Sequence, residues 1–96
     1  MPKGYWVTLY HSVKNPGVLT EYAKLATPVV QAHGGRFLSR GKAAKAYEAG
    51  LLERSVIVEF DSVQDAIAAY ESPEYKKAIE VLGEAQRDVR ILEGIS

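Results

Sequence analysis

The sequence contains no cysteine among its 96 residues, which excludes a disulfide framework and thiol chemistry. It also has no excess charge of either sign, because twelve basic and twelve acidic side chains cancel to a formal net charge of zero. Nucleic-acid binding normally requires a basic surface, whereas the basic residues here are spread along the chain among acidic ones. We therefore expect no nucleic-acid partner.

Long apolar segments are absent as well. No stretch approaches the ~20 apolar residues of a membrane span, and the first six residues lack the apolar core of a signal peptide. The absence of cysteine is compatible with a reducing compartment. These features together predict a cytoplasmic protein with no membrane partner. The remaining composition, 47% hydrophobic and 25% charged, is that of one globular domain over residues 1–96.

The order of strand-like and helix-like segments predicts the fold class. β-Branched and aromatic residues predict strands at residues 5–12, 36–40, 55–60 and 88–92, with a short extra strand at 46–48. Apolar residues at helical spacing predict one helix between Asn15 and Gly34 and a second one after Ser62. The order βαββαβ is that of the ferredoxin-like α+β fold, a four-stranded antiparallel sheet with its helices on one face.

Helix boundaries are predicted from capping residues. Asn15 is expected to be the N-cap of the first helix, with Pro16 at the first helical position. Ser62 has the spacing of a capping box with Asp65 and opens the second helix. Ser72, which is followed by a proline, is a further N-cap. We therefore expect the second helix to break and restart at that serine.

Alternation along the strands predicts that neither face of the sheet is simply polar. On the first strand, one side carries Tyr5, Val7, Leu9 and His11, and the other carries Trp6, Thr8 and Tyr10. With both helices on one face, the other face would expose a large apolar patch, which usually marks an interface. We therefore expect a homodimer in which two open sheet faces pack together.

Arginines on the second strand are candidates for a binding site. Arg36 and Arg40 lie four positions apart, which predicts one shared strand face and a separation of about 13 Å. Two guanidinium forks suit a carboxylate or an enolate, and Tyr10 would add a phenol. A carboxylate between two apolar residues needs a partner. We therefore expect Glu59 to pair with Arg36, Arg40 or Arg54.

The candidate ligand site, in a cleft between the sheet and the helices, therefore consists of Tyr10, Arg36, Arg40 and Glu59. The alternative is that the arginines form only structural ion pairs. His11 and His33 have no histidine or carboxylate at ligand spacing, so we expect no metal site. We expect no cofactor, and we assign no catalytic residue, because no serine has a histidine and an acid near it in the sequence.

Five short motifs run along the chain. They are GYW at residues 4–6, GGRFL at 34–38 followed by Arg40-Gly41, EF with a serine at 59–62, SPEY at 72–75, and EG at 93–94. In this combination the chain resembles one family of the dimeric α/β-barrel, ferredoxin-like superfamily, known mainly as a domain of unknown function. The resemblance implies the ferredoxin-like fold and a sheet-to-sheet dimer.

The resemblance leaves three functional hypotheses, because the family has no agreed reaction. The first is a homodimer that binds a small molecule, acidic or aromatic in character. The second is a cofactor-independent enzyme, since the superfamily includes quinone-forming monooxygenases, muconolactone-type isomerases and dehydratases. The third is a structural or accessory protein without a ligand.

The chain departs from the family at Lys42, where a glycine is usual, and at Leu82, where an arginine is often found.

Overall fold

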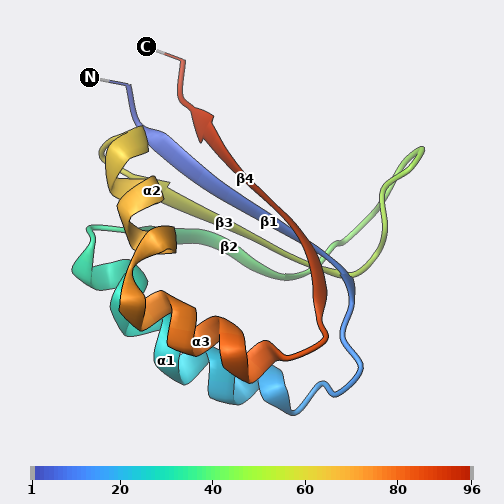
Figure 1. The fold of residues 1–96 in the computed structure, drawn as a ribbon. Helices are drawn as coiled ribbons and strands as arrows, with labels where there is room; N and C mark the ends of the chain where they lie inside the picture. The colour runs from blue at the N-terminus through green and yellow to red at the C-terminus, as the bar shows by residue number, and fades with distance from the viewer. Residues whose placement is uncertain (1, 96) are drawn as a thin grey trace.

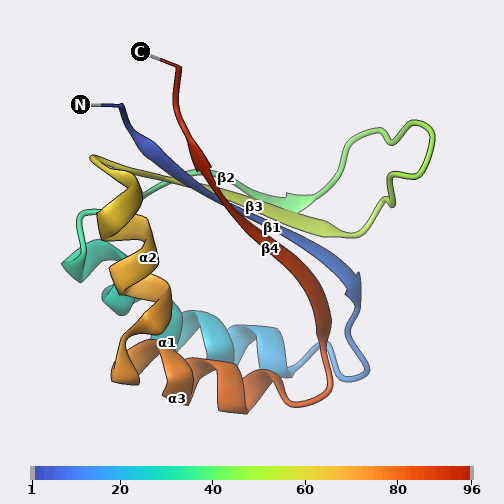
Figure 2. The same ribbon diagram turned by 45° about the horizontal axis from the view of Figure 1, so that its top comes forward.

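The computed structural model describes residues 2–95 and forms a two-layer α+β domain. Its elements are β1 (Gly4–Ser12), α1 (Val18–Ala32), β2 (Arg36–Lys42), β3 (Arg54–Phe60), α2 (Val63–Glu71), α3 (Pro73–Leu82) and β4 (Gln86–Glu93). The strands form one antiparallel sheet in the order β2-β3-β1-β4. All three helices lie on one face of this sheet, and the other face is open (Figures 1 and 2). The expected ferredoxin-like fold is confirmed.

Two serine caps produce the break between α2 and α3. The Ser62 hydroxyl oxygen accepts a hydrogen bond from the Asp65 backbone N–H at 3.1 Å, and that of Ser72 accepts from the Tyr75 N–H at 3.2 Å. The Ser72 hydroxyl also donates to the Ala69 carbonyl at 2.9 Å. Ser72 therefore ends α2 and starts α3, as the sequence predicts, and the new helix begins with Pro73.

The start of α1 differs from the expectation. The helix begins at Val18, and the Asn15 side chain accepts a hydrogen bond from the Gly17 N–H at 3.1 Å. Asn15 therefore stabilises a turn ahead of the helix, as asparagine often does, and the prediction that it is the N-cap was wrong by two residues. At the other end, Gly34 has a φ of 83° and takes the left-handed conformation that terminates many helices.

The strand boundaries also differ in detail. β2 runs two residues further than predicted, and β4 begins two residues earlier. The extra strand predicted at residues 46–48 is wrong. Glu48 has a φ of 53°, and the Gly50 N–H donates to the Tyr47 carbonyl at 2.9 Å, so a turn forms there. Figure 1 shows the loop that contains this turn, between β2 and β3, extending away from the sheet.

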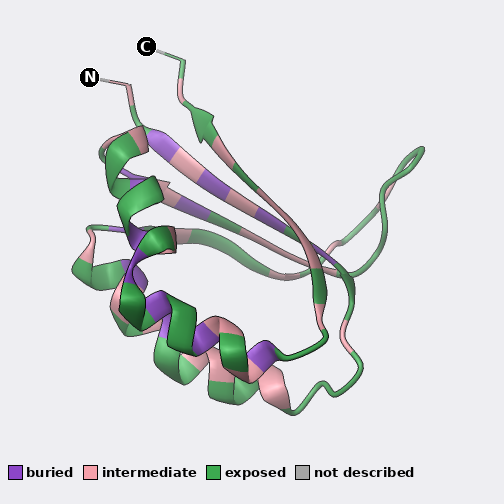
Figure 3. Ribbon diagram, viewed as in Figure 1, coloured by how far each residue is buried: buried purple, intermediate pink, exposed green. Residues whose placement is uncertain are grey.

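The core lies between the sheet and the helices (Figure 3), and Trp6 of β1 belongs to its buried cluster. The Trp6 ring packs edge-on against Tyr75 at 4.9 Å and Tyr70 at 5.4 Å, and lies parallel to Phe60 at 6.1 Å between ring centroids. Such aromatic pairs contribute about 0.5–1.5 kcal/mol each beyond simple burial. Tyr75 and Phe60 are fully buried. The aromatic cluster therefore fixes α2 and α3 against the two central strands.

A β-bulge in β2 decides which of its side chains face the helices. Arg36 pairs with Glu59 and Phe37 with Val58, but the next pairs on the ladder start at Ser39, so residue 38 is extra. One extra residue reverses the alternation of side chains along a strand. Arg36 therefore lies on the open face and Arg40 on the helix face. The expectation that the two arginines share a face was wrong.

None of the helices within residues 2–95 is long and apolar enough to cross a membrane.

A close backbone approach at Gly4 provides a test of the packing between β1 and α2. A Cβ atom on Gly4 would lie 2.4 Å from the Ser62 carbonyl oxygen and 2.7 Å from the Val63 Cα. Because these are backbone atoms, the strand itself would have to shift. We expect Gly4→Ala to lower the free energy of unfolding by about 1–3 kcal/mol, measured by urea denaturation.

The matched control for this test is Gly17→Ala. Its Cβ would meet only the Asn15 side chain, at 3.2 Å, and its φ of −61° suits alanine. We expect a change of no more than about 0.5 kcal/mol. Equal losses in the two variants would contradict the close approach of β1 and α2.

Candidate functional site

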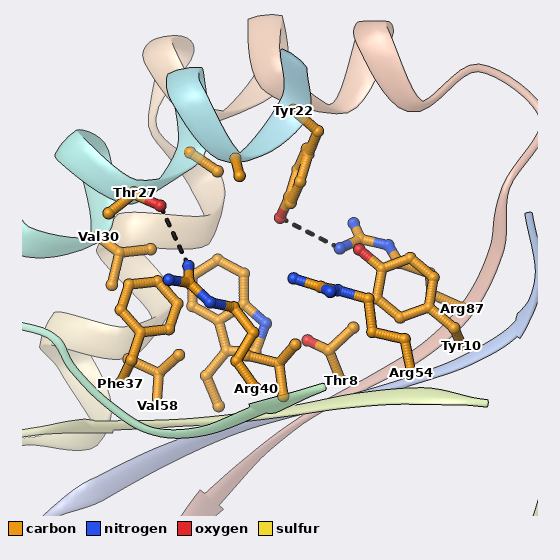
Figure 4. A pocket seen from close by; sticks show the side chains of 14 residues that line it. Thr8, Tyr10, Tyr22, Thr27, Val30, Phe37, Arg40, Arg54, Val58 and Arg87 are labelled. Atoms are coloured by element: carbon orange, nitrogen blue, oxygen red, sulfur yellow. Dashed lines mark hydrogen bonds between the residues drawn. The ribbon is translucent and has the colours of Figure 1, made fainter. Parts of the chain in front are cut away.

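A cavity lies between α1 and the helix face of the sheet (Figure 4). Its lining residues are Trp6, Thr8, Tyr10, Tyr22, Ala23, Ala26, Thr27, Val30, Phe37, Arg40, Arg54, Val56, Val58 and Arg87. The sheet supplies an apolar floor, and α1 supplies one wall. The free space is about 30 Å³, which is room for roughly two water molecules. A larger ligand would therefore have to displace a side chain.

Three arginines from three different strands point into this space. Figure 4 shows the guanidinium groups of Arg40, Arg54 and Arg87 gathered beneath α1. None of the residues that line the cavity is acidic. Guanidinium groups stay charged in proteins, so the cavity concentrates positive charge without an internal carboxylate to balance it. This arrangement suits an anionic ligand.

Arg40 is held in place by β2 and α1 together. Its Nη1 donates a hydrogen bond to the Thr27 hydroxyl oxygen of α1 at 3.3 Å. Its guanidinium carbon also lies 4.4 Å from the centre of the Phe37 ring, within the range of a cation–π contact. The bulge allows this contact, because it places Phe37 and Arg40 on the same face although they are three residues apart. The remaining guanidinium N–H groups stay available to a ligand.

Arg87, on β4, is held by two tyrosine hydroxyls. Its Nη1 donates to the hydroxyl oxygens of Tyr22 at 3.3 Å and Tyr75 at 3.2 Å. Its guanidinium carbon lies 5.6 Å from the Tyr10 ring centre and 5.4 Å from that of Tyr22. The two hydroxyls of Tyr22 and Tyr75 are also hydrogen bonded to each other. Arg87 is thereby fixed between α1, α3 and β1.

The same network places two neutral phenol groups beside the cavity. Burial raises the pKa of Tyr75 well above its usual value, and burial also raises the pKa of Tyr22 against the opposing effect of the Arg87 cation. Both phenols are therefore neutral near pH 7, with one hydrogen each. Either hydroxyl can donate to the other. Of the two residues, Tyr22 lines the cavity, so its neutral hydroxyl lies at the cavity wall.

Arg54 differs from the other two arginines. It is half-buried at the start of β3. Its side chain has no hydrogen-bonding or ion-pairing partner among the residues that the structure describes. Figure 4 shows its guanidinium group between those of Arg40 and Arg87. Arg54 is therefore the one of these three arginines that no described side chain holds through a hydrogen bond or an ion pair.

The structure separates the four residues of the predicted ligand site into two pairs. Tyr10 and Arg40 line the cavity. Arg36 and Glu59 lie on the open face, where their side chains form an ion pair at 3.0 Å. Arg36 also pairs with Asp61 at 3.1 Å, and the Tyr5 hydroxyl donates to Glu59 at 3.2 Å. The expected pairing of Glu59 with an arginine is confirmed, and the bulge in β2 is the reason that this pair lies away from the cavity.

Sequence reasoning missed Arg54 and Arg87 as cavity residues, although a signal was present. Arg54 lies two and four positions before Val56 and Val58 on β3, and Arg87 lies two positions before Val89 on β4, so each shares a strand face with these valines. A count of strand positions from these apolar neighbours would have placed both arginines on the helix face.

Neither histidine lies in the cavity. His11 is exposed at the end of β1. The His33 Nδ1 lies 2.9 Å from the Val29 carbonyl at the end of α1, as a helix-capping role requires. Within residues 2–95 there is no cluster of three or more histidine, cysteine or acidic side chains that could hold a metal ion.

The fold and the cavity define a ferredoxin-like α+β protein with an arginine-rich, aromatic-walled cleft between sheet and helices. The chain belongs to the family described as Domain of unknown function (DUF1330), whose profile matches residues 3–95. The resemblance drawn from the short motifs is therefore confirmed. No curated protein has a sequence that matches this chain.

Solved structures share this fold at low sequence identity. A protein of unknown function from Rhodopseudomonas palustris is 16% identical, with a TM-score of 0.73 over 99% of this chain and 84% of that one. A dimeric, ferredoxin-like protein of unknown function from Bacteroides fragilis is 14% identical, with a TM-score of 0.62 over 95% of each chain. SnoaB, a cofactor-independent oxygenase from Streptomyces nogalater, is 10% identical, with a TM-score of 0.63 over 100% of this chain and 96% of that one. At these identities the similarity establishes the fold alone.

The tyrosine network around Arg87 can be tested by removing one hydroxyl group. We expect Tyr75→Phe to lower the free energy of unfolding by about 1 kcal/mol, measured by urea denaturation, because the hydroxyl bonds to both Tyr22 and Arg87 are lost. Tyr70→Phe is the control, since Tyr70 packs on the same Trp6 ring and its hydroxyl makes no side-chain hydrogen bond among the described residues. An equal loss in the two variants would contradict the network.

Proposed function

We propose that the protein binds a small organic acid in the cavity between α1 and the sheet. The observation that carries this proposal is the concentration of three guanidinium groups in a cavity with no acidic lining residue. An anion would relieve the repulsion among these cations and would accept charge-assisted hydrogen bonds from them. The apolar floor suits the hydrocarbon part of the same molecule.

The distribution of ion pairs over the two faces of the sheet supports an anionic ligand. The two arginines on the open face are paired with carboxylates, Arg36 with Glu59 and Asp61, and Arg90 with Asp88. The three arginines in the cavity have no such partner among the described residues. Because the protein has as many acidic as basic side chains, the absence of acids from the cavity is not a consequence of composition.

A cofactor-independent enzyme is the second candidate. The fold shared with the Streptomyces nogalater oxygenase motivates it, and the arginines with the Tyr22 hydroxyl could stabilise an enolate. The lining contains no histidine, aspartate, glutamate, cysteine or serine. Such a reaction would therefore require a substrate that arrives already ionised. Binding without turnover needs no such condition, and we favour it.

An accessory protein without a ligand is the remaining hypothesis, and the small free volume is the observation in its favour.

We also propose that the protein is a homodimer formed by the open faces of two sheets. Large apolar side chains lie on that face, and Leu9, Ile57 and Leu92 are between 37% and 49% exposed in the single chain. Exposed apolar surface of this kind usually marks an interface. The Bacteroides fragilis protein of the same fold is described as dimeric.

A cytoplasmic location stays a prediction from the sequence.

The dimer can be tested in solution. We expect sedimentation at micromolar concentration to give a species of twice the 10.6 kDa chain mass, because sheet-face interfaces of standard size persist at that concentration. Ile57→Asp should convert this species to the single chain, because it places a charge in the apolar face. A wild-type protein that sediments only as a single chain would rule out the dimer.

Ligand binding can be tested by comparing acids with their neutral amides. We expect benzoate or a short keto acid at millimolar concentration to raise the Tm of the wild type, and the corresponding amide to leave it unchanged. Arg87→Gln should weaken binding of the acid by about tenfold, because one charge-assisted hydrogen-bonding group is lost. Lys42→Gln is the matched control, since it removes one positive charge from a residue that does not line the cavity. If no acid raises the Tm, the accessory hypothesis gains instead.

A further inference from the structure

We infer that the ligand of this cavity is a dicarboxylic acid with a short, flat hydrocarbon spacer, held at one end by Arg87 and at the other by Arg40. The inference rests on the proposed function and narrows its ligand class. It depends on three features of the cavity, which are the position of its two fixed arginines, the freedom of the third, and the apolar floor between them.

The two fixed arginines approach the cavity from opposite edges of the sheet. Arg40 lies on β2 and Arg87 on β4, and these are the two outer strands. Three strand spacings separate them, or about 14 Å between the strand axes. Figure 4 shows their side chains reaching into the cavity from opposite sides. One guanidinium fork already binds both oxygens of a carboxylate, so a single carboxylate would leave the other fixed arginine unpaired.

Each of the two arginines is held before any ligand is bound. Tyr22 and Tyr75 hold Arg87 through hydrogen bonds of 3.3 and 3.2 Å to its Nη1. Thr27 and the Phe37 ring hold Arg40. Ordering a long side chain on binding costs about 0.5–1.5 kcal/mol. Because that ordering is already present at both ends, the cavity favours a ligand that uses both.

Arg54 occupies the space between these two arginines. The free volume of about 30 Å³ is too small for an organic acid, so the ligand must displace a side chain. Arg54 is the one that the described residues do not hold by any hydrogen bond or ion pair. Once it has turned outward, two cations remain in the cavity, and two carboxylates balance them.

The surface between the two ends is apolar and partly aromatic. Trp6, Phe37, Val56 and Val58 form the floor on the sheet. A flat hydrocarbon spacer buries apolar area there without leaving a polar group unpaired. Apart from the arginines and the hydroxyls of Thr8 and Tyr10, this floor offers a polar spacer no hydrogen-bonding side chain.

Terephthalate and 4-methylbenzoate form a matched pair of probes. They share one flat ring and differ by the replacement of a carboxylate with a methyl group. We expect calorimetric titration of the wild type to give binding of terephthalate at least tenfold tighter than that of 4-methylbenzoate, because a second charge-assisted contact is made. Arg40→Gln should reduce this difference to about twofold or less, since Arg87 is then the one fixed arginine left to bind a carboxylate of either acid.

The control variant is Lys42→Gln, which removes the same charge from the same strand outside the cavity and should keep the preference for terephthalate. Circular dichroism of each variant checks that it is folded. Equal affinities of the wild type for the two acids would overturn the dicarboxylate inference and leave the proposed function standing. A persistent preference for terephthalate in Arg40→Gln would overturn the assignment of Arg40. If neither acid binds at millimolar concentration, both the inference and the proposed function fail.

Discussion

The packing of Tyr75 connects the core of this protein to its polar cavity. Its ring is fully buried against Trp6, and its hydroxyl accepts a hydrogen bond from Arg87. Ser72 positions the residue by capping α3 through the Tyr75 N–H. A local signal, a serine before a proline, therefore fixes a helix, the helix fixes a core ring, and the ring holds a cation at the edge of the cavity. The packing of the core and the position of this cation therefore depend on the same side chain.

The two faces of the sheet use arginine in different ways. On the open face, guanidinium groups are neutralised by carboxylates from neighbouring strand positions. On the helix face, they are held by hydroxyls and aromatic rings, which orient a guanidinium without neutralising it. The second arrangement leaves the charge available to a ligand. The type of partner, more than the number of arginines, therefore distinguishes the cavity from the surface.

Much of the fold could be predicted because its signals are local. The serine at position 72 predicted the helix break, and the alternation along β1 predicted that Trp6, Thr8 and Tyr10 share one face; both predictions agree with the structure. The site was predicted less well. Nothing in the residues around Leu38 indicates a bulge, so Arg36 and Arg40 were assigned to one face. Arg87 was missed for a different reason, because the last strand was predicted to begin at residue 88, whereas β4 begins at Gln86.

The bulge at Leu38 also affects how this chain should be aligned with its relatives. Leu38 is 55% exposed and has no partner on the β3 ladder. A relative that lacks this residue could keep every other pair between the two strands, and its equivalent of Arg40 would still face the helices. Such a gap in an alignment would therefore leave the residues that face the cavity unchanged. A deletion in β2 that kept the bulge would exchange the two faces of the strand beyond it, and with them the arginine that the cavity receives.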